Sequence, residues 1–207
     1  DDALWPQRAD GQGSSLEVVN VAGEVSEPAD FWASVEVGGS PGATGSTGDG
    51  DVRINEILAN PLDGQSDQIE LIKRESPSID ISGWYLSDDP DDLWKYRVPD
   101  GTVMVRDNTF VVDSDQLGFG ISSVGETILL VSSGDASQRP RFMDVVSIDG
   151  SEPGVSLGRW PNRIGSLVPM QRPSLGELNT GPKFADVVIS EIHHAPRDPD
   201  GTGPLSA

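Results

Sequence analysis

The chain contains no cysteine. Disulfide bonds, zinc sites built from thiolates and cysteine nucleophiles are therefore excluded. It also has no run of about 18 apolar residues, so no segment is predicted to insert into a membrane. Basic residues are scarce: 14 lysines and arginines stand against 34 aspartates and glutamates, a formal net charge of −20. Such a charge repels phosphate backbones, which argues against binding to nucleic acids.

Apolar and aromatic residues are few as well, whereas turn-forming residues are abundant. Hydrophobic residues make up 35% of the 207 positions and aromatic residues 6%, against 24 glycines and 16 prolines. This balance suits many short strands joined by turns rather than long helices. Divalent cations or cationic partners match the acidic surface, although such a surface also keeps a secreted protein in solution.

The clearest strand signal lies in residues 80–89, which read DISGWYLSDD. Trp84 and Leu86 are two residues apart and so fall on one face of a strand, with Tyr85 on the other. A tryptophan in a short strand often anchors the core of a β-sandwich. Further strands are predicted at residues 52–58, 68–73, 93–98, 102–105, 108–113, 126–131 and 142–148, and around Leu157 and Val168. Their spacing predicts an all-β sandwich, with a turn or single helical turn near residues 118–123.

The sequence begins to repeat itself near its end. Residues 186–192 (DVVISEI) restate residues 51–57 (DVRINEI) 135 positions later, and Ser174-Leu175-Gly176 restates Ser40-Pro41-Gly42 at nearly the same offset. Two agreeing offsets predict a tandem array with a period of one domain. The predicted parts are the closing strands of a preceding copy (residues 1–44), a flexible linker (45–50), one complete domain (51–182) and the opening strand of a following copy (183–207).

Residues 51–182 resemble the lamin tail domain, in the form found in secreted multidomain proteins of bacteria, including tandem arrays in planctomycetes. The resemblance rests on six motifs in the order of the family: INEI at 54–57 with NP at 60–61, IEL at 69–71, DISGWYLSD at 80–88, RVPDGT at 97–102, GFGIS at 118–122 and SLGRWP at 156–161. It implies an immunoglobulin-like β-sandwich. It implies no enzymatic activity, because the family has no established catalytic residues. The chain has no heptads, so the role of nuclear lamins is not implied.

Four carboxylates within five residues form the strongest candidate site, at Asp88, Asp89, Asp91 and Asp92. Hard oxygen ligands of this kind suit calcium. The spacing lacks the D-x-[DN]-x-[DN]-G loop of an EF-hand, however, and a solvated acidic turn bent at Pro90 explains the same residues. Calcium is thus the only candidate cofactor, and an acidic turn without a bound ion is the simpler interpretation.

A second candidate metal site lies near the C-terminal end of the sequence. His193 and His194 lie close to Asp198 and Asp200, and imidazoles with carboxylates can bind a metal ion. Adjacent residues of a strand point to opposite faces, however. An ordinary strand end followed by a turn is therefore the preferred interpretation.

Two further groups of residues have a structural and a functional interpretation. Glu56 and Glu70 could serve as an acid/base pair, but no cleft or nucleophile accompanies them, so they are predicted to be structural strand residues. Trp94, Tyr96 and Trp160 could present an aromatic platform to a glycan, although packing at the core or edge is the default. No catalytic residue is predicted.

These observations predict a non-catalytic module of a secreted or cell-surface bacterial protein, acting as a structural spacer and protein-interaction unit. The alternatives are a calcium- or carbohydrate-binding surface module and an accessory domain of a larger secreted enzyme. The expected partners are other proteins or neighbouring repeats. Because exposed strand edges attract further strands, residues 1–44 and 186–207 are expected to pair with each other or to be exchanged between chains.

Overall fold

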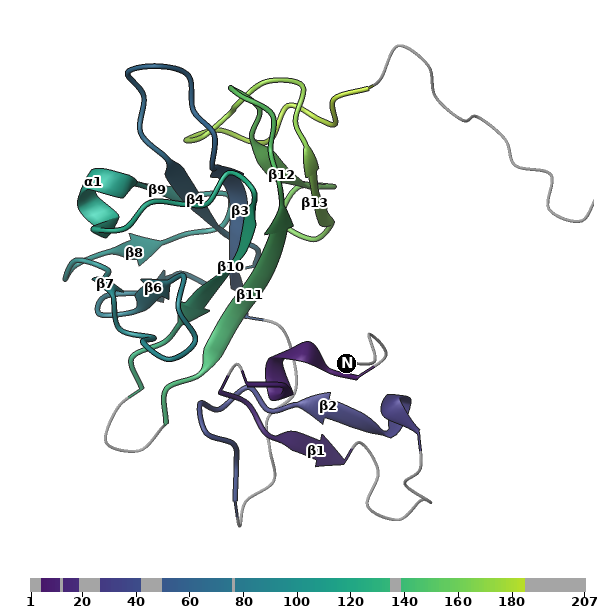
Figure 1. The fold of residues 1–207 in the computed structure, drawn as a ribbon. Helices are drawn as coiled ribbons and strands as arrows, with labels where there is room; N and C mark the ends of the chain where they lie inside the picture. The colour runs from purple at the N-terminus through teal and green to yellow at the C-terminus, as the bar shows by residue number, and fades with distance from the viewer. Residues whose placement is uncertain are drawn as a thin grey trace, which may run out of the picture.

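The computed structural model describes residues 5–11, 13–18, 27–41, 50–75, 77–134 and 139–184. The residues from 50 onward form a β-sandwich, and the described residues between 5 and 41, called here the N-terminal unit, lie against one end of it (Figure 1). The predicted all-β class with an immunoglobulin-like sandwich is confirmed. Within these described ranges, no helix has the length and apolar character needed to cross a membrane.

One layer of the sandwich is a five-stranded antiparallel sheet in the order β13-β12-β3-β4-β9. Its strands are β3 (Val52–Leu58), β4 (Gln68–Lys73), β9 (Thr109–Asp113), β12 (Leu157–Trp160) and β13 (Ser166–Pro169). The central strands β3 and β4 are buried over almost their whole length. They must therefore be covered on both faces, by the core on one side and by another part of the chain on the other.

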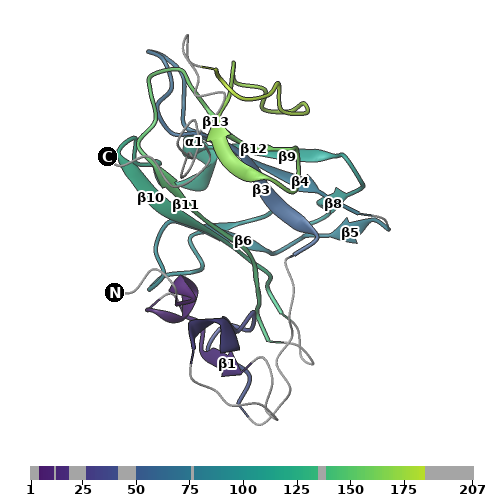
Figure 2. The same ribbon diagram turned by 90° about the vertical axis from the view of Figure 1, so that its right-hand side faces the viewer.

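The opposite layer is a four-stranded sheet in the order β11-β10-β6-β7 (Figure 2). Its strands are β6 (Tyr85–Ser87), β7 (Tyr96–Arg97), β10 (Gly125–Val131) and β11 (Phe142–Asp149). A two-stranded sheet of β5 (Ile79–Asp80) and β8 (Val103–Met104) completes the sandwich. Most of the predicted strands are thus confirmed in position, although several are shorter than expected.

The core lies between the two layers and is built from alternate residues of their strands. Trp84 and Leu86 are both buried in it, as their spacing predicts. Tyr85 lies on the other face, where its ring meets the ring of Trp94 edge-on with centroids 5.0 Å apart. The other central members include Val52, Ile54, Ile57, Ile69, Leu71, Val112, Ile128, Leu130, Val146 and Leu157.

The N-terminal unit is a small hairpin with two single-turn helices. Its elements are η1 (Gln7–Ala9), β1 (Leu16–Val18), η2 (Pro28–Asp30) and β2 (Phe31–Ala33). β1 and β2 pair antiparallel as a two-stranded sheet of their own. The ring of Trp5 lies against the ring of Phe31, with centroids 5.2 Å apart.

Two local predictions differ from the structure. The strand predicted at residues 93–98 is wrong in its first half: the Asp92 carboxylate accepts a hydrogen bond from the Trp94 backbone N–H (3.2 Å), which holds a turn there. The single helical turn is α1 (Ser114–Leu117), just before the expected place. Asp113 caps it by accepting from the Gln116 N–H (2.9 Å), a D-x-x-Q pattern that is typical of a helix start.

Candidate functional site: a buried carboxylate pair

Two glutamates lie side by side on the face of the five-stranded sheet that points away from the core. Glu56 of β3 and Glu70 of β4 are direct partners in the strand register, and both are fully buried. The register of β3 shifts between Ile54 and Glu56, so Asn55 is the extra residue of a β-bulge. The bulge places the Asn55 and Glu56 side chains opposite the single residue Glu70. Buried carboxylates are stable only when donors surround them.

The Glu56 carboxylate receives three hydrogen bonds from serines outside β3. Its Oε1 accepts from the Ser156 hydroxyl (2.5 Å) and from the Ser174 backbone N–H (2.8 Å). Its Oε2 accepts from the Ser174 hydroxyl (2.8 Å). Glu56 therefore connects the start of β12 and the segment after β13 to the centre of the sheet.

The Glu70 carboxylate is held in the same way. One oxygen accepts from the Asn55 side-chain amide (2.7 Å), and the other accepts from the Gly176 backbone N–H (2.6 Å). The Asn55 amide also donates to the side-chain oxygen of Asn179 (3.0 Å), whose own amide donates to the Arg159 carbonyl (3.0 Å). The segment of residues 170–182, called here the C-terminal cover, is thus fastened to the sheet at Ser174, Gly176 and Asn179.

The pKa of Glu70 is raised from 4.5 to about 7, mainly by burial and to a smaller extent by the nearby Glu56 carboxylate. The hydrogen bonds from Asn55 and Gly176 act in the opposite direction, because they favour the charged form. Desolvation has the largest effect. Glu70 consequently exchanges a proton with solvent near neutral pH in the folded protein.

The two carboxylates hold the C-terminal cover against the sheet through hydrogen bonds. Each of the four carboxylate oxygens accepts a hydrogen bond from within the chain, and the donors come mainly from the C-terminal cover. A hollow beside the pair is lined by Leu58, Gln68, Pro173 and Leu175, among others, but not by either glutamate. The sequence indicated that Glu56 and Glu70 are structural. It did not show that they meet, or that Asn55, Ser174 and Asn179 join them.

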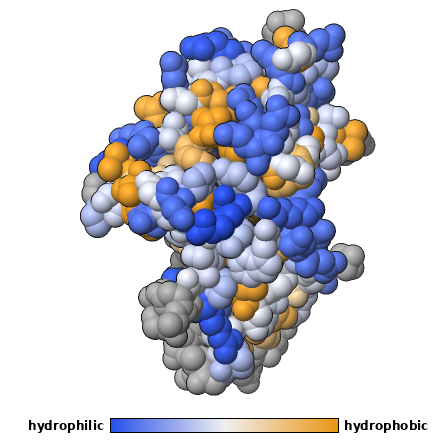
Figure 3. All heavy atoms as spheres, turned by 90° about the vertical axis from the view of Figure 1, so that its left-hand side faces the viewer, coloured by the Kyte–Doolittle hydropathy of each residue, from blue (hydrophilic) through white to orange (hydrophobic). Residues whose placement is uncertain are grey.

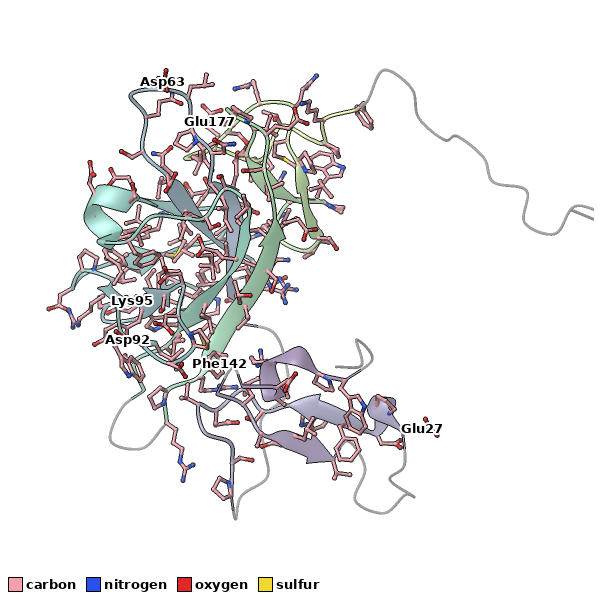
Figure 4. The ribbon with its side chains drawn as sticks, viewed as in Figure 1. Glu27, Asp63, Asp92, Lys95, Phe142 and Glu177 are labelled. Atoms are coloured by element: carbon pink, nitrogen blue, oxygen red, sulfur yellow. The ribbon has the colours of Figure 1, made fainter. Side chains whose placement is uncertain are left out.

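The acidic turn after β6 engages its carboxylates locally (Figure 4). Asp88 forms an ion pair with Lys95 at 2.8 Å, and an Asp89 oxygen accepts from the Asp91 N–H (2.9 Å). Among the described residues, no three histidine, aspartate or glutamate side chains come together in a way that could hold a metal ion. Calcium binding by Asp88, Asp89, Asp91 and Asp92 stays the alternative to the simpler interpretation of an acidic turn.

The other candidate residues are dispersed. His193, His194, Asp198 and Asp200 lie outside the described residues. Among the aromatic candidates, Tyr96 belongs to β7 and packs against the core, whereas Trp160 ends β12 on the opposite sheet. Trp94 is 45% exposed and Trp160 43% exposed. Because Trp94 lies in the turn before β7 and Trp160 ends β12 of the other sheet, no single sheet presents all three residues to a glycan.

The N-terminal unit joins the sandwich through backbone hydrogen bonds of the kind found between strands. The Phe142 N–H donates to the Val35 carbonyl (2.7 Å). Two residues further on in the unit, the Val37 N–H donates to the Pro140 carbonyl (2.9 Å). Residues 35–37 therefore extend alongside the start of β11, where Phe142 faces the N-terminal unit (Figure 4).

Side chains reinforce this junction. The guanidinium of Arg8 lies over the Phe142 ring, 5.5 Å from its centroid. Val35 and Phe142 are both almost completely buried. On the other side of the linker, the Gly50 N–H donates to the Met143 carbonyl (3.0 Å). The start of β11 thus contacts the chain both before and after residues 42–49.

Residues 46–148 match the family model described as Lamin Tail Domain. The match spans β3 to β11 and includes Glu56 and Glu70. Comparisons with curated proteins and with solved structures found no match. The family match supports the resemblance that the six sequence motifs carry.

Proposed function

We propose that residues 51–182 form a lamin tail domain that serves, without catalysis, as a structural spacer and protein-interaction module in a tandem array. The family match over residues 46–148 supports the domain type. The return of the β3 sequence at residues 186–192 supports the array. A spacer in such an array must hold its neighbours in a fixed direction, and the contacts at both ends of the sandwich suit this task.

The main support for a spacer role is the junction between the sandwich and the N-terminal unit. The strand-like hydrogen bonds that Val35 accepts from Phe142 and that Val37 donates to Pro140 define one orientation, because hydrogen bonds need both distance and direction. The Phe142 side chain is buried where the two parts meet, in a cluster against which Val37 of the N-terminal unit packs. A flexible linker alone would leave the two parts free to rotate, whereas this junction joins them as one body.

The buried carboxylate pair fixes the other end. Glu56 and Glu70 hold the C-terminal cover, and the cover leads directly to the repeated strand sequence. A following copy would therefore start from a segment whose position is set by the sheet. Both chain ends of the sandwich then have defined positions, which gives the array a constant spacing.

We also propose that the array belongs to a secreted or cell-surface protein of the bacterial type. The net charge of −20 supports this setting, because an acidic surface keeps a secreted protein in solution. Hydrophilic residues cover much of the face shown in Figure 3, with hydrophobic residues scattered among them. Such a surface keeps an extended protein in solution and leaves its contacts to specific patches.

The test is whether the two parts tumble together. In the 207-residue chain, backbone ¹⁵N relaxation should give one rotational correlation time for the N-terminal unit and the sandwich. The Phe142→Ala variant should separate the two times, because it removes a buried side chain where the two parts meet. Val124→Ala, at a residue 86% exposed, is the matched control and should leave one time. Two different correlation times in the unmodified chain would overturn the proposal.

A further inference from the structure

The hairpin of the N-terminal unit has the same design as the hairpin that closes the sandwich. Both begin with Gly-x-Ser-Leu, at residues 13–16 and 154–157. The glycine has a left-handed φ in both, +82° at Gly13 and +72° at Gly154. In both, the leucine opens a strand that pairs antiparallel with the next strand of the chain.

A backbone hydrogen bond closes each hairpin at the same place. The Ser34 N–H donates to the Ser15 carbonyl at 2.8 Å, directly after β2. The Met170 N–H donates to the Ser156 carbonyl at 2.9 Å, directly after β13. β1 therefore corresponds to β12, and β2 corresponds to β13.

The two hairpins differ at their outer edge. β12 pairs on that edge with β3, which places Leu157 opposite Ile57 and leaves Leu157 only 8% exposed. No described residue pairs with the corresponding edge of β1, and Leu16 is 45% exposed. An apolar strand edge of this kind is a template for a further strand.

The structure assigns this edge an occupant: we propose that β1 binds residues 186–192 of a second copy of the chain as an additional antiparallel strand. Five of the seven residues in this segment are identical to those of residues 51–57, which include nearly all of β3. By analogy with the β12–β3 register, Ile192 would lie opposite Leu16. Glu191 would take the place of Glu56, next to the hydroxyl of Ser15, which corresponds to Ser156.

The geometry favours a second copy over the same chain. The described chain ends at Phe184, at the end of the sandwich away from the N-terminal unit (Figures 1 and 2). Only Ala185 separates Phe184 from the segment, and two residue steps span about 7 Å at most. Each copy thus offers one donor segment and one acceptor edge, which gives a head-to-tail association. This contact lies between chains, so a flexible junction within one chain would leave it unchanged.

Glu17 sets the strength of this contact. It occupies the position of Gly158, which pairs with Glu56 in the sandwich, so it would lie opposite Glu191. Like charges directly opposite in a sheet are unfavourable. Glu17→Gln should therefore tighten the association, by up to about fivefold. Glu27→Gln, which removes the same charge at an exposed site outside the hairpin strands, should not change it.

Sedimentation equilibrium of the 207-residue chain is the test. We expect the mass to rise with concentration in the unmodified chain, and both Ile189→Pro (no donor) and Leu16→Asp (no acceptor) to stay monomeric. An equimolar mixture of the two variants should form a heterodimer that cannot grow, because only one donor and one acceptor remain. Thr202→Pro and Val124→Asp are the matched controls and should associate normally. A monomer at all concentrations, or a mixture that stays monomeric, would overturn the proposal.

A synthetic peptide of residues 185–193 gives a second measurement that does not depend on any variant of the donor. Its binding to the unmodified chain, followed by fluorescence anisotropy, should be saturable and should be lost in Leu16→Asp. A peptide of the same composition in scrambled order is the control. Equal binding of both peptides would contradict the proposal.

Discussion

The closing hairpin occurs twice in this chain, once inside the sandwich and once in the N-terminal unit. The strand pairing and the closing hydrogen bond are the same in both. Burial is different: Leu157 is covered by β3, whereas Leu16 is 45% exposed. The hairpin is therefore specified by its own residues, while its burial depends on strands that come from elsewhere in the chain.

The position of the carboxylate separates the two hairpins as well. In the sandwich, Glu56 comes from β3 and accepts from the Ser174 hydroxyl, and the facing residue of the hairpin is Gly158. In the N-terminal unit, the hairpin itself carries Glu17, which accepts from the hydroxyl of Ser40. In both parts, a serine that follows the hairpin thus donates to a carboxylate. In the sandwich the carboxylate belongs to the neighbouring strand β3, and in the N-terminal unit it belongs to the hairpin itself.

The largest loss of stability should come from Arg159→Ala. Arg159 lies in β12, which is buried by its pairing with β3, whereas the corresponding strand β1 has no such partner among the described residues. The Arg159 guanidinium donates to the Ile54 carbonyl (2.8 Å) and to both oxygens of Asp144, and the Arg159–Asp144 pair is almost fully buried. Its loss leaves a buried carboxylate without a cation, so we expect a decrease of about 3–5 kcal/mol in the free energy of unfolding, measured by denaturant titration.

Val18→Ala is the matched variant, because Val18 takes the place of Arg159 in the other hairpin. It should lower the stability by less than about 1 kcal/mol. A double variant of Arg159 and Asp144 should lose less than the two single variants added together. Equal losses from Arg159→Ala and Val18→Ala would show that the two hairpins are held in the same way, contrary to our comparison.

The next largest effect is a dependence of stability on pH, which arises from the buried pair Glu56 and Glu70 of the sandwich. No such pair is found among the described residues of the N-terminal unit. The folded pKa of Glu70, about 7, lies above its ordinary value of 4.5, so the folded state binds the proton more tightly. The resulting stabilisation is fully present below about pH 4.5 and is lost as the pH rises through 7. The difference corresponds to about 3 kcal/mol.

Denaturant titrations between pH 4.5 and 8 test this prediction. Glu70→Gln should remove the decrease in stability over this range, because the amide does not titrate. Glu177→Gln, at an exposed position of the C-terminal cover, should keep the profile of the unmodified chain. The same profile in all three proteins would mean that Glu70 does not hold a proton near neutral pH.

A smaller effect is expected from Gly158→Ala. A Cβ atom at this position would lie 2.7 Å from the Asn179 amide and 2.9 Å from Met170, so the C-terminal cover would have to move. We expect a loss of about 1–3 kcal/mol in the free energy of unfolding. Gly120→Ala, whose added methyl group would meet only Asp67 at 3.4 Å, should stay within about 0.5 kcal/mol of the unmodified chain.

The smallest effect on stability is expected from added calcium. This measurement tests whether the acidic turn of the sandwich binds a ligand, a role for which the N-terminal unit has no corresponding turn among its described residues. Asp88 already pairs with Lys95, and Asp89 and Asp92 accept from nearby backbone N–H groups. We therefore expect the melting temperature to be the same with calcium and with a chelator. A ligand at a hundredfold excess over its Kd would add about 2.7 kcal/mol, so a clear increase would establish the site.

Much of the sandwich could be predicted from the sequence because its strands are marked locally. The Trp84–Leu86 spacing and the apolar runs of β3, β4, β10 and β11 indicate both the strands and the inward faces. The shortening of the strand before Tyr96 could not be predicted from hydrophobicity, since it depends on side chain to backbone bonds in the acidic turn. The position of helix α1 could have been predicted, because its capping pattern is visible in the sequence.

The carboxylate pair was not predictable in the same way. Glu56 and Glu70 are visible as charged residues inside apolar strands, which is a signal of buried polar contacts. Their meeting depends on the strand register and on the bulge at Asn55. Their partners Ser174 and Gly176 come from more than 100 residues further along the chain. Periodicity in one segment contains no information about such distant partners.

The junction also determines how the protein would respond to a pulling force. Tension applied to the N-terminal unit reaches the hydrogen bonds between residues 35–37 and the start of β11 before it reaches the core. When these bonds break, the two parts stay connected through the chain between Pro41 and Gly50, whose eight residues span about 28 Å at most. We expect the sandwich to stay folded during this first extension. A tandem array built in this way would lengthen in small steps, one junction at a time, and would recover its length when the tension falls.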